Sequence, residues 1–297
     1  MPVEAERTET RFPVWLRRSL TVSDHWDATK RTIRELGLST ICEEGRCPNL
    51  GECWSHRNVS FMILGEHCTR RCGFCAVTTA KPSAPDPSES GRLAEAIARL
   101  GLQYVVLTAP ARDDLPDEGA GPFADAIQAI KARTPLVGVE VLIPDFHARE
   151  ALLATVVAAG PDVIAHNLET VRRLTPSVRP QAGYDRSLAV LAALRRQAPL
   201  RVRTKSGIMV GLGERPEEVR AAMNDLWYAG CELLTIGQYL QPTPQQHPVV
   251  ECVPPEQFAE YRRWGLALGF SHVASGPYVR SSYNAYEAMS RKDAVIG

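Results

Sequence analysis

Six of the eight cysteines in this 297-residue chain lie in two triplets, and the spacing differs between the triplets. The triplets are Cys42, Cys47 and Cys53, spaced C-x4-C-x5-C, and Cys68, Cys72 and Cys75, spaced C-x3-C-x2-C. Each triplet offers three thiolates from one short segment, which leaves one ligand position of a four-coordinate metal or of a cluster open. The fold therefore has to hold two metal sites, each completed by some other group.

Composition narrows the class of protein and its partners. The formal net charge is zero at pH 7, which argues against nucleic acid or an anionic membrane as the main partner. No stretch reaches the ~18 uncharged apolar residues of a membrane span. Residues 1–18 alternate acids and bases and include Glu4, Glu6 and Glu9, unlike a secretory signal or a transit peptide. We expect a cytoplasmic protein, in which reduced thiols favour metal binding over disulfides.

From Val59 onward, the sequence pattern predicts an alternation of β-strands and α-helices. Short apolar runs alternate with segments whose apolar residues recur at helical spacing, as buried parallel strands and their covering helices do. This alternation implies right-handed crossovers and a parallel sheet. The expected strands are Val59–Leu64, Tyr104–Thr108, Val137–Leu142, Asp162–His166, Val202–Ile208 and Glu232–Ile236.

Polar residues recur where these strands end, among them Thr108, Asn167, Glu169 and Lys205. In a parallel barrel the carboxyl ends of the strands meet at one face, where active sites form. This pattern favours a barrel over a doubly wound sheet. We predict an α/β fold, a partial (β/α)6 TIM-like barrel over residues 59–270. Residues 1–58, which carry the first triplet, and residues 271–297 are expected to be extensions that close the barrel mouth.

The second triplet follows directly after the first expected strand. Structural zinc takes four protein ligands, usually in C-x2-C pairs, and no partner pair accompanies Cys68, Cys72 and Cys75. Soft thiolates also suit iron–sulfur clusters. The ligand chemistry favours an iron–sulfur cluster, with zinc or incidental buried cysteines as the alternatives.

The same segment resembles the cluster motif of the radical S-adenosylmethionine (radical SAM) superfamily, including the aromatic Phe74 before the last cysteine. In that superfamily three thiolates hold a 4Fe–4S cluster, and the amino and carboxylate groups of S-adenosylmethionine (SAM) chelate the remaining iron. Residues 207–214 also follow the superfamily's G-x-I-x-G-x-x-E pattern, with Met209 at the isoleucine position. The resemblance implies a barrel of the radical SAM type that cleaves SAM to a radical.

The first triplet narrows the resemblance to the lipoyl synthase family. The surrounding sequence, from Glu44 to Trp54, is similar to the segment that carries the C-x4-C-x5-C motif in that family. The similarity extends over nearly everything from Cys42 to Tyr286. Further stretches that agree are Arg112–Asp117, His166–Thr170, Val178–Pro180, Thr204–Gly207 and Leu234–Thr243.

The family resemblance implies a second, auxiliary 4Fe–4S cluster on the first triplet, completed by a serine from a C-terminal Arg-Ser-Ser-Tyr motif. This chain carries that motif at residues 280–283. Ser282 matches the ligand position, Ser281 is the alternative, and Arg280 is expected to position the serine or to contact substrate. The implied metal ligands are Cys42, Cys47, Cys53 and Ser282 at one cluster and Cys68, Cys72 and Cys75 at the other.

The resemblance also implies a reaction and its partners. The substrate is octanoyl-lysine on a lipoyl carrier domain, such as a dehydrogenase E2 subunit or the glycine cleavage H protein. Two SAM molecules in turn yield radicals that remove hydrogen at C6 and C8, and the sacrificial auxiliary cluster supplies sulfur. Other expected partners are a low-potential electron donor, such as ferredoxin or flavodoxin, and an iron–sulfur carrier.

Contacts to SAM are expected around the barrel mouth. The residue types alone leave alternatives open, because Asn167 and Glu169 also suit a solvated cap, and Arg179 and Lys205 also suit structural ion pairs. The expected SAM-binding residues are Phe74, Thr108, Asn167, Glu169, Arg179, Lys205, Met209 and Gly211.

One segment departs from the family. Lipoyl synthases usually read Thr-Ser-Val-Asp where this chain has Thr108-Ala109-Pro110-Ala111. A hydroxyl and a carboxylate are absent at the end of the second strand, where the methionine part of SAM commonly binds. The departure keeps a second hypothesis open, a radical SAM paralogue that acts on another acyl or protein substrate. A third, from another class, is a zinc-bearing scaffold or binding protein.

Overall fold

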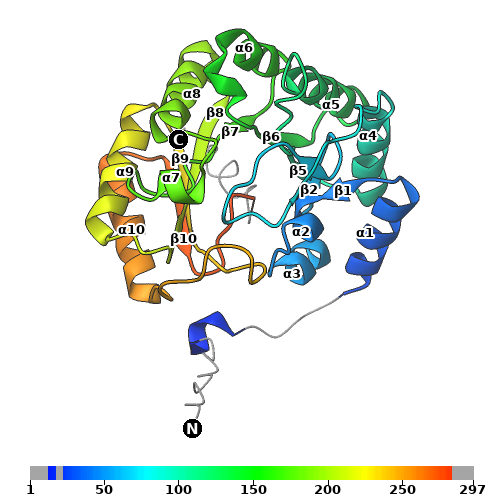
Figure 1. The fold of residues 1–297 in the computed structure, drawn as a ribbon. Coiled ribbons are helices and arrows are strands. Elements are labelled where there is room, and N and C mark those ends of the chain that lie inside the picture. The colour runs from blue at the N-terminus through cyan, green and yellow to red at the C-terminus, as the bar shows by residue number, and fades with distance from the viewer. Residues whose placement is uncertain (1–12, 18–22, 283–297) are drawn as a thin grey trace, which may run out of the picture.

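A curved, mostly parallel sheet forms the inner layer of the molecule, and helices surround it (Figure 1). The computed structural model describes residues 13–17 and 23–282. Within these residues every pairing in the main sheet is parallel except that of its first two strands. In sheet order the strands are β1 (Ser39–Thr40), β2 (Ser60–Met62), β5 (Tyr104–Thr108), β6 (Gly138–Leu142), β7 (Val163–Ala165), β8 (Arg203–Val210), β9 (Leu233–Gln238) and β10 (His272–Gly276).

Within the main sheet, one long helix follows each strand from β2 to β9 and returns over the outer face of the sheet (Figure 1). Local sequence sets their ends: the helix that starts at Pro216 has Glu217 and Glu218 in its first turn, which complements the helix dipole. None of the helices in the described ranges is long and apolar enough to cross a membrane. The covering helices are α4 (Glu89–Leu100), α5 (Ala120–Arg133), α6 (Glu150–Ala158), α8 (Tyr184–Gln197), α9 (Pro216–Tyr228) and α10 (Pro255–Leu268).

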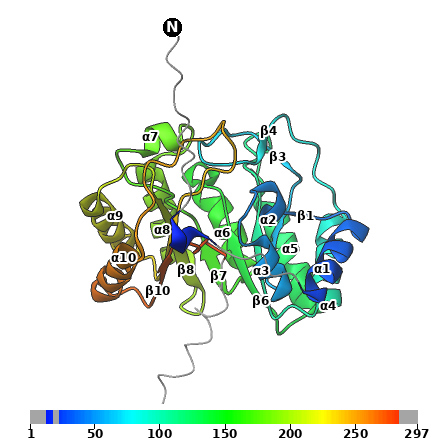
Figure 2. The same cartoon turned by 90° about the horizontal axis from the view of Figure 1, so that it is seen from below.

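Shorter elements lie before the barrel and in its loops. Seen from the side, β3, β4 and α7 gather at one end of the barrel, whereas α2 and α3 lie beside the sheet (Figure 2). The shorter elements are η1 (Val14–Leu16), α1 (Asp24–Glu35), α2 (Ile41–Glu44), α3 (Leu50–Ser55), β3 (His67–Cys68), β4 (Thr78–Thr79), η2 (Phe146–Ala148) and α7 (Thr175–Val178).

The structure confirms the predicted fold class and all six predicted strands, which correspond to β2 and β5–β9 with bounds within two residues of those expected. The sequence pattern missed β10, which pairs in parallel with β9. Its sequence, Ser-His-Val-Ala-Ser-Gly from residue 271, lacks an apolar run, and Val273 is its one buried apolar side chain. Two strands, β1 and β10, thus join the sheet from outside residues 59–270.

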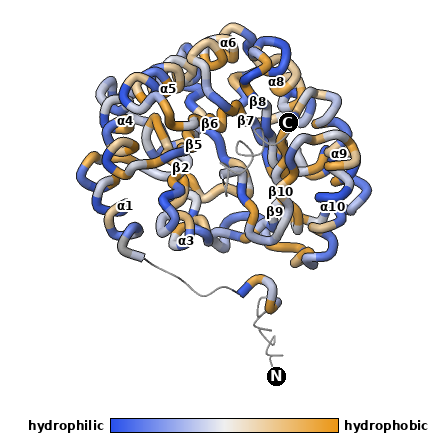
Figure 3. The backbone as a smooth tube through the Cα atoms, turned by 180° about the vertical axis from the view of Figure 1, so that it is seen from behind, coloured by the Kyte–Doolittle hydropathy of each residue, from blue (hydrophilic) through white to orange (hydrophobic). Residues whose placement is uncertain are grey.

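Side chains alternate along each strand between the outer helices and the barrel interior. Val105 and Leu107 of β5 are fully buried in the outer core together with Leu93 and Ile97 of α4. Hydrophobic residues accordingly recur along the strands, and hydrophilic stretches are spread over the outer helices and loops (Figure 3). The outer core fixes the strands, so the interior positions are free to carry polar groups.

A buried ion pair occupies the interior side of the sheet. Lys205 Nζ of β8 lies 2.8 and 3.0 Å from the two carboxylate oxygens of Glu140 on β6. The Tyr104 hydroxyl donates to the same carboxylate over 2.8 Å, and Glu140 and Lys205 are 0% and 3% exposed. A desolvated ammonium needs such a counter-charge. Lys205 therefore forms a structural ion pair, the alternative to the cofactor contact expected for it.

His166, directly after β7, joins three parts of the fold. Its Nδ1 donates to Ile143 O (3.0 Å) and its Nε2 accepts from the Ser187 hydroxyl of α8 (3.0 Å). Burial, reinforced by the positive charge of Arg179, lowers the pKa of His166 from 6.5 to about 4. The ring is therefore neutral at pH 7, as both hydrogen bonds require.

Replacing Lys205 by Met is expected to lower the free energy of unfolding by about 3–5 kcal/mol, because it leaves the Glu140 carboxylate buried without a counter-charge. Adding Glu140→Gln should restore most of the loss, since Gln still accepts from Tyr104. Urea denaturation measures both effects. The matched control is Lys131→Met, which breaks a half-exposed pair with Asp162 (3.3 Å) and should change stability by less than about 1 kcal/mol. Equal effects of the two lysine variants would contradict the assignment.

The pKa of His166 predicts a loss of stability in mild acid. Because the folded pKa lies near 4 and the unfolded one near 6.5, the unfolded chain binds more protons between these values. Stability is therefore complete above about pH 6.5 and falls toward pH 4, by about 2 kcal/mol between pH 7.5 and pH 5. Urea denaturation of the wild-type protein and of His166→Asn at both pH values isolates this component. Identical pH slopes for the two proteins would refute it.

Candidate metal centres

The first triplet lies on two short helices and the turn between them, beside the edge of the sheet. Cys42 is on α2 and Cys53 on α3, and backbone bonds from Cys47 N to Cys42 O (3.0 Å) and from Cys53 N to Asn49 O (2.8 Å) fold the segment into a compact loop. Thr40 begins α2 by accepting from Glu43 N (3.3 Å), a favourable N-cap. The sequence thus forms a local three-thiol cradle.

The three thiols face one cavity that a distant segment completes. Ser282 and Arg280 line this cavity with Cys42, Cys47 and Cys53. The cavity also meets the first residues of β2 and β5, including Ser60 and Tyr104. The predicted ligands are thereby brought together from segments about 230 residues apart in the sequence.

The cradle stands at the side of the barrel, next to the starts of these strands, rather than over the mouth predicted for the N-terminal extension. The reason is the antiparallel pairing of β1 with β2, in which Ser39 lies opposite Met62 and Thr40 opposite Phe61. The chain that leaves Thr40 therefore runs toward the start of β2. The open edge of the sheet, and not the carboxyl ends of the strands, receives the first triplet.

The donor set of this cavity suits a metal cluster. All described cysteines are free thiols, and burial raises the pKa of Cys42 to about 11. Such a thiol is neutral at pH 7 unless a bound metal replaces its proton. Three soft sulfur donors and one hydroxyl around a single space fit an iron–sulfur cluster with one weaker ligand.

The second triplet lies on the loop that follows β2. Gly73 N donates to Val178 O (2.8 Å), and His247 N donates to Gly73 O (2.8 Å). A Cβ atom on Gly73 would lie 2.4 Å from His247 Cδ2, so only glycine permits this contact. Gln246 Nε2 donates to Cys75 O (3.0 Å). The β9–α10 loop therefore packs against the loop of the second triplet, called the cluster loop below, and His247 is part of this packing.

A charged clamp fixes the other side of the same loop. Arg70 donates to both oxygens of Asp113 (2.8 and 2.7 Å) and lies 2.8 Å from Asp145. Arg70 and Asp145 are 7% and 1% exposed, and the guanidinium holds the pKa of Asp145 well below its usual range, against the effect of burial. Thr69 adds a bond to Asp113 (3.0 Å). The Arg112–Asp117 motif is thus linked to the cluster loop, a role that sequence reasoning did not assign.

The departure from the family at residues 109–111 does not remove the backbone contacts between this segment and the loop of the second triplet. Ala111 N lies 3.3 Å from Cys68 Sγ, and Ala111 O accepts from the Thr69 hydroxyl (3.0 Å). Neither contact needs a side chain beyond Cβ at position 111. Thr108, which the chain retains, donates to Leu142 O (3.0 Å).

Most of the predicted SAM-binding residues surround the second triplet in one cavity. The wall of this cavity comes from the ends of β2, β5 and β6, from residues that follow β7, and from Arg179 and Ala182 after α7. Burial raises the pKa of Cys72 to about 11 and that of Cys75 to about 12. The predicted residues that line the cavity are Cys68, Cys72, Cys75, Phe74, Thr108, Asn167, Glu169 and Arg179.

Asn167 and Glu169 form a polar pair on the wall of this cavity. Asn167 Nδ2 donates to Glu169 Oε1 (3.0 Å), while Asn167 Oδ1 is buried without a protein partner among the described residues. Burial raises the pKa of Glu169, with Arg179 opposing it. Glu169 adopts a left-handed backbone (φ +66°), fixed by backbone bonds to Gly207 and Met209 (2.9 and 2.8 Å). An unpaired acceptor in a pocket is a ready contact for a ligand.

Three predicted contacts lie elsewhere or serve the fold as well. Met209 lines an adjacent cavity with Glu169 and Gly207. Gly211 has φ +98°, and a Cβ there would lie 2.1 Å from Gln238 Nε2, so its glycine is required by the turn. Arg179 lines the cavity of the second triplet but donates to Leu168 O (3.0 Å) and Ser187 Oγ (3.1 Å).

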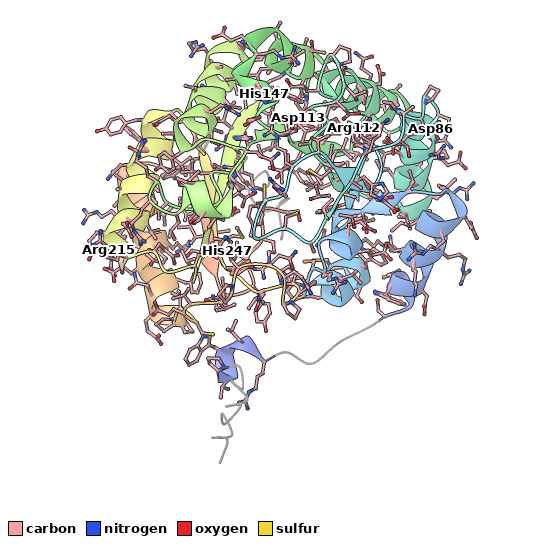
Figure 4. The ribbon with its side chains drawn as sticks, viewed as in Figure 1. Asp86, Arg112, Asp113, His147, Arg215 and His247 are labelled. Atoms are coloured by element: carbon pink, nitrogen blue, oxygen red, sulfur yellow. The ribbon has the colours of Figure 1, made fainter. Side chains whose placement is uncertain are left out.

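A third group of polar side chains lies near the clamp. His147 and Asp113 lie close together in Figure 4, and His147 Nδ1 is 3.9 Å from Asp113 Oδ1 and 2.8 Å from Glu118 Oε1. Arg149 Nη2 lies 2.8 Å from Glu118 Oε1, and Arg70 Nη2 lies 2.7 Å from Asp113 Oδ1. Arginines already neutralise both carboxylates, so this group is an ion-pair network.

Comparisons with known proteins agree with this geometry. The sequence profile of the radical SAM superfamily matches residues 62–226, and that of the N-terminal domain of lipoyl synthase matches residues 3–47. The lipoyl synthase of Thermus thermophilus is 53% identical over 94% of this chain and 87% of its own length. That of Anaeromyxobacter sp. is 54% identical over 95% of this chain and 96% of its own.

Solved structures show the same fold at low identity. Methylornithine synthase (PylB) has a TM-score of 0.55 at 15% identity and covers 89% of this chain and 85% of its own. The FeFe-hydrogenase maturase HydG from Carboxydothermus hydrogenoformans also has a TM-score of 0.55, at 14% identity, over 90% of this chain and 78% of its own. With two cysteine cavities arranged as described and identities above 50% over nearly the whole chain, the chain belongs to the lipoyl synthase family of the radical SAM superfamily.

Proposed function

We propose that this enzyme inserts sulfur at C6 and C8 of octanoyl-lysine on a lipoyl carrier domain. Membership of the radical SAM superfamily implies SAM and a 4Fe–4S cluster as cofactors. The proposal of sulfur insertion rests on one observation: Ser282 lines one cavity with all three cysteines of the first triplet. This donor set supports a second, auxiliary cluster that serves as the sulfur source.

The two cavities would hold clusters with different functions. Cys68, Cys72 and Cys75 would hold the cluster that binds SAM, and Cys42, Cys47, Cys53 and Ser282 would hold the auxiliary one. When bound, SAM supplies a 5′-deoxyadenosyl radical that removes hydrogen from a C–H bond. Residues 1–58 would present the auxiliary cluster and residues 271–297 its serine ligand, with residues 59–270 as the barrel.

Residues around the second triplet would bind and orient SAM. Asn167 Oδ1, buried and unpaired, accepts from an ammonium or ribose hydroxyl, and the Glu169 carboxylate beside it offers a second acceptor. Phe74 and Thr108 also line this cavity. The backbone carbonyls of Ala109 and Pro110 would take the place of the side chains that lipoyl synthases usually carry there, since Ala111 O already accepts from Thr69.

The reaction requires partners that contact this chain. Octanoylated lipoyl domains, on dehydrogenase E2 subunits or the glycine cleavage H protein, would present the substrate. A ferredoxin or flavodoxin would deliver electrons, and an iron–sulfur carrier would rebuild the auxiliary cluster. We place this activity in the cytoplasm, where reducing conditions keep the thiols available.

Anaerobically purified protein is expected to contain about eight iron atoms and eight sulfides per chain, since each 4Fe–4S cluster contributes four. With SAM, a low-potential reductant and an octanoyl-lysyl peptide, mass spectrometry should detect a product that has gained two sulfur atoms. Formation of 5′-deoxyadenosine without sulfur gain would point to a different substrate. Zinc without sulfide would eliminate the enzyme proposal.

Single cysteine variants should separate the two clusters. Cys72→Ala removes a ligand of the SAM-binding cluster and is expected to abolish 5′-deoxyadenosine formation. Cys47→Ala should retain that cleavage but give no sulfur-containing product. Each variant should lose about four iron atoms per chain. The control is Cys252→Ala, which removes a free thiol outside both triplets and should keep iron content and activity. Loss of SAM cleavage in Cys47→Ala would contradict the assignment of separate roles to the two clusters.

A further inference from the structure

We infer that Asn49, Gly237 and Ser281 are positioning residues that fix the register of the C-terminal tail and so deliver Ser282 to the first triplet. The tail is here residues 277–282. The inference rests on the proposed role of Ser282 as ligand of the auxiliary cluster, and it concerns how one serine of two adjacent ones is selected.

Gly237 on β9 provides the space that the tail occupies. A Cβ atom at this position would lie 2.0 Å from Val279 O and 3.3 Å from Arg280 Nη1. Gly237 sits within a regular strand, paired with Gly276 of β10, so its backbone conformation does not itself demand glycine. The close approach of the tail backbone is therefore the reason that a side chain is excluded at Gly237.

Asn49 ties the tail to the loop of the first triplet. Its Nδ2 donates to Tyr278 O over 2.7 Å, across 229 positions of sequence. Asn49 is 1% exposed and lines the same cavity as Cys42 and Ser282. A buried amide that bonds a backbone carbonyl fixes the position of that carbonyl more firmly than an exposed one does.

Ser281 fixes the tail on the opposite side. Its hydroxyl accepts from Asn167 Nδ2 over 2.7 Å, and it lines the cavity that contains Gly207 and Glu169. A Cβ atom on Gly207 would lie 3.1 Å from Ser281 Oγ, so the absence of a side chain there leaves room for this hydroxyl. The two serines thus face different cavities.

Register decides which serine meets the cysteines. A slip of one residue moves the chain by the ~3.8 Å between consecutive Cα atoms, far more than the ~0.2 Å tolerance of a metal–ligand distance. The contacts of Tyr278, Val279 and Ser281 hold three successive points of the tail against such a slip. With these contacts in place, Ser282 is the hydroxyl that lines the first cavity.

The test is Gly237→Ala, with Gly276→Ala as its matched control. The control adds the same methyl group to the paired strand, but a Cβ there would lie 3.5 Å from Val279 Cγ2, an ordinary contact. Tail docking is read by the rate of tryptic cleavage after Arg280, followed by mass spectrometry of the full-length protein. Ligation is read from the Mössbauer spectrum of the holoenzyme, in which an iron held by serine differs from irons held by cysteine alone.

Gly237→Ala is expected to raise the cleavage rate at least about tenfold, because the methyl group displaces the tail backbone and increases the open population. It should also remove the distinct iron site from the spectrum. Ser281→Ala, which deletes the bond to Asn167 without adding volume, should shift both readouts in the same direction. Gly276→Ala should match the wild type in both.

The outcomes separate the inference from the proposed function. If Ser282→Ala alters the distinct iron site but Gly237→Ala and Ser281→Ala do not, Ser282 is a ligand and the positioning inference is overturned. If Ser282→Ala leaves the spectrum unchanged, the ligand assignment fails and the inference fails with it. Faster cleavage in Gly237→Ala with an unchanged spectrum also overturns the inference, since Ser282 would then bind iron although the contact of the tail with β9 is lost.

Discussion

An incomplete barrel has to fill its interior from other parts of the chain, and this constraint organises the whole molecule. The sheet begins at β1 and ends at β10, and these two edge strands do not pair with each other. The helices cover the outside only (Figure 1). The first triplet therefore lies at the open side, and Val279 and Arg280 lie against Gly237 of β9. A closed barrel fills its interior with layers of its own side chains. Here an N-terminal segment and a C-terminal segment contribute to that filling.

The interior of the barrel is filled in two different ways, by side chains of the strands and by the C-terminal tail. Near the middle of the strands, Lys205 and Glu140 fill the interior with a paired charge that needs no further partner. Toward the carboxyl ends, Gly207 and Gly237 leave space instead, and the tail enters it. The polar and the empty positions alternate with buried apolar ones such as Leu234 and Ile236, which bind the strands to the outer helices. The outer face of the sheet thus carries apolar contacts to the helices, whereas the inner face carries both a stabilising ion pair and the space that the tail occupies.

The sequence was a good guide wherever one local pattern determined the outcome. The six apolar runs predicted β2 and β5–β9, because burial on both faces selects such runs. It was a poor guide where long-range contacts decide: β10 forms from a weakly apolar segment because β9 offers it a free edge, and Lys205 pairs with a residue 65 positions away. The clamp of Arg70 by Asp113 and Asp145 likewise joins three separate loops. The spacing of residues within one segment does not predict contacts between separate loops.

Asn167 connects the second cavity with the tail that completes the first. It lies in the wall of the second cavity, and its amide donates to Ser281, the residue next to Ser282. Any group that changes the orientation of this amide acts on both cavities. In genetic terms, position 167 is pleiotropic: a substitution there cannot be assigned to cofactor binding or to tail docking from a loss of activity alone. Two chemically different sites in one enzyme are thereby constrained to change together.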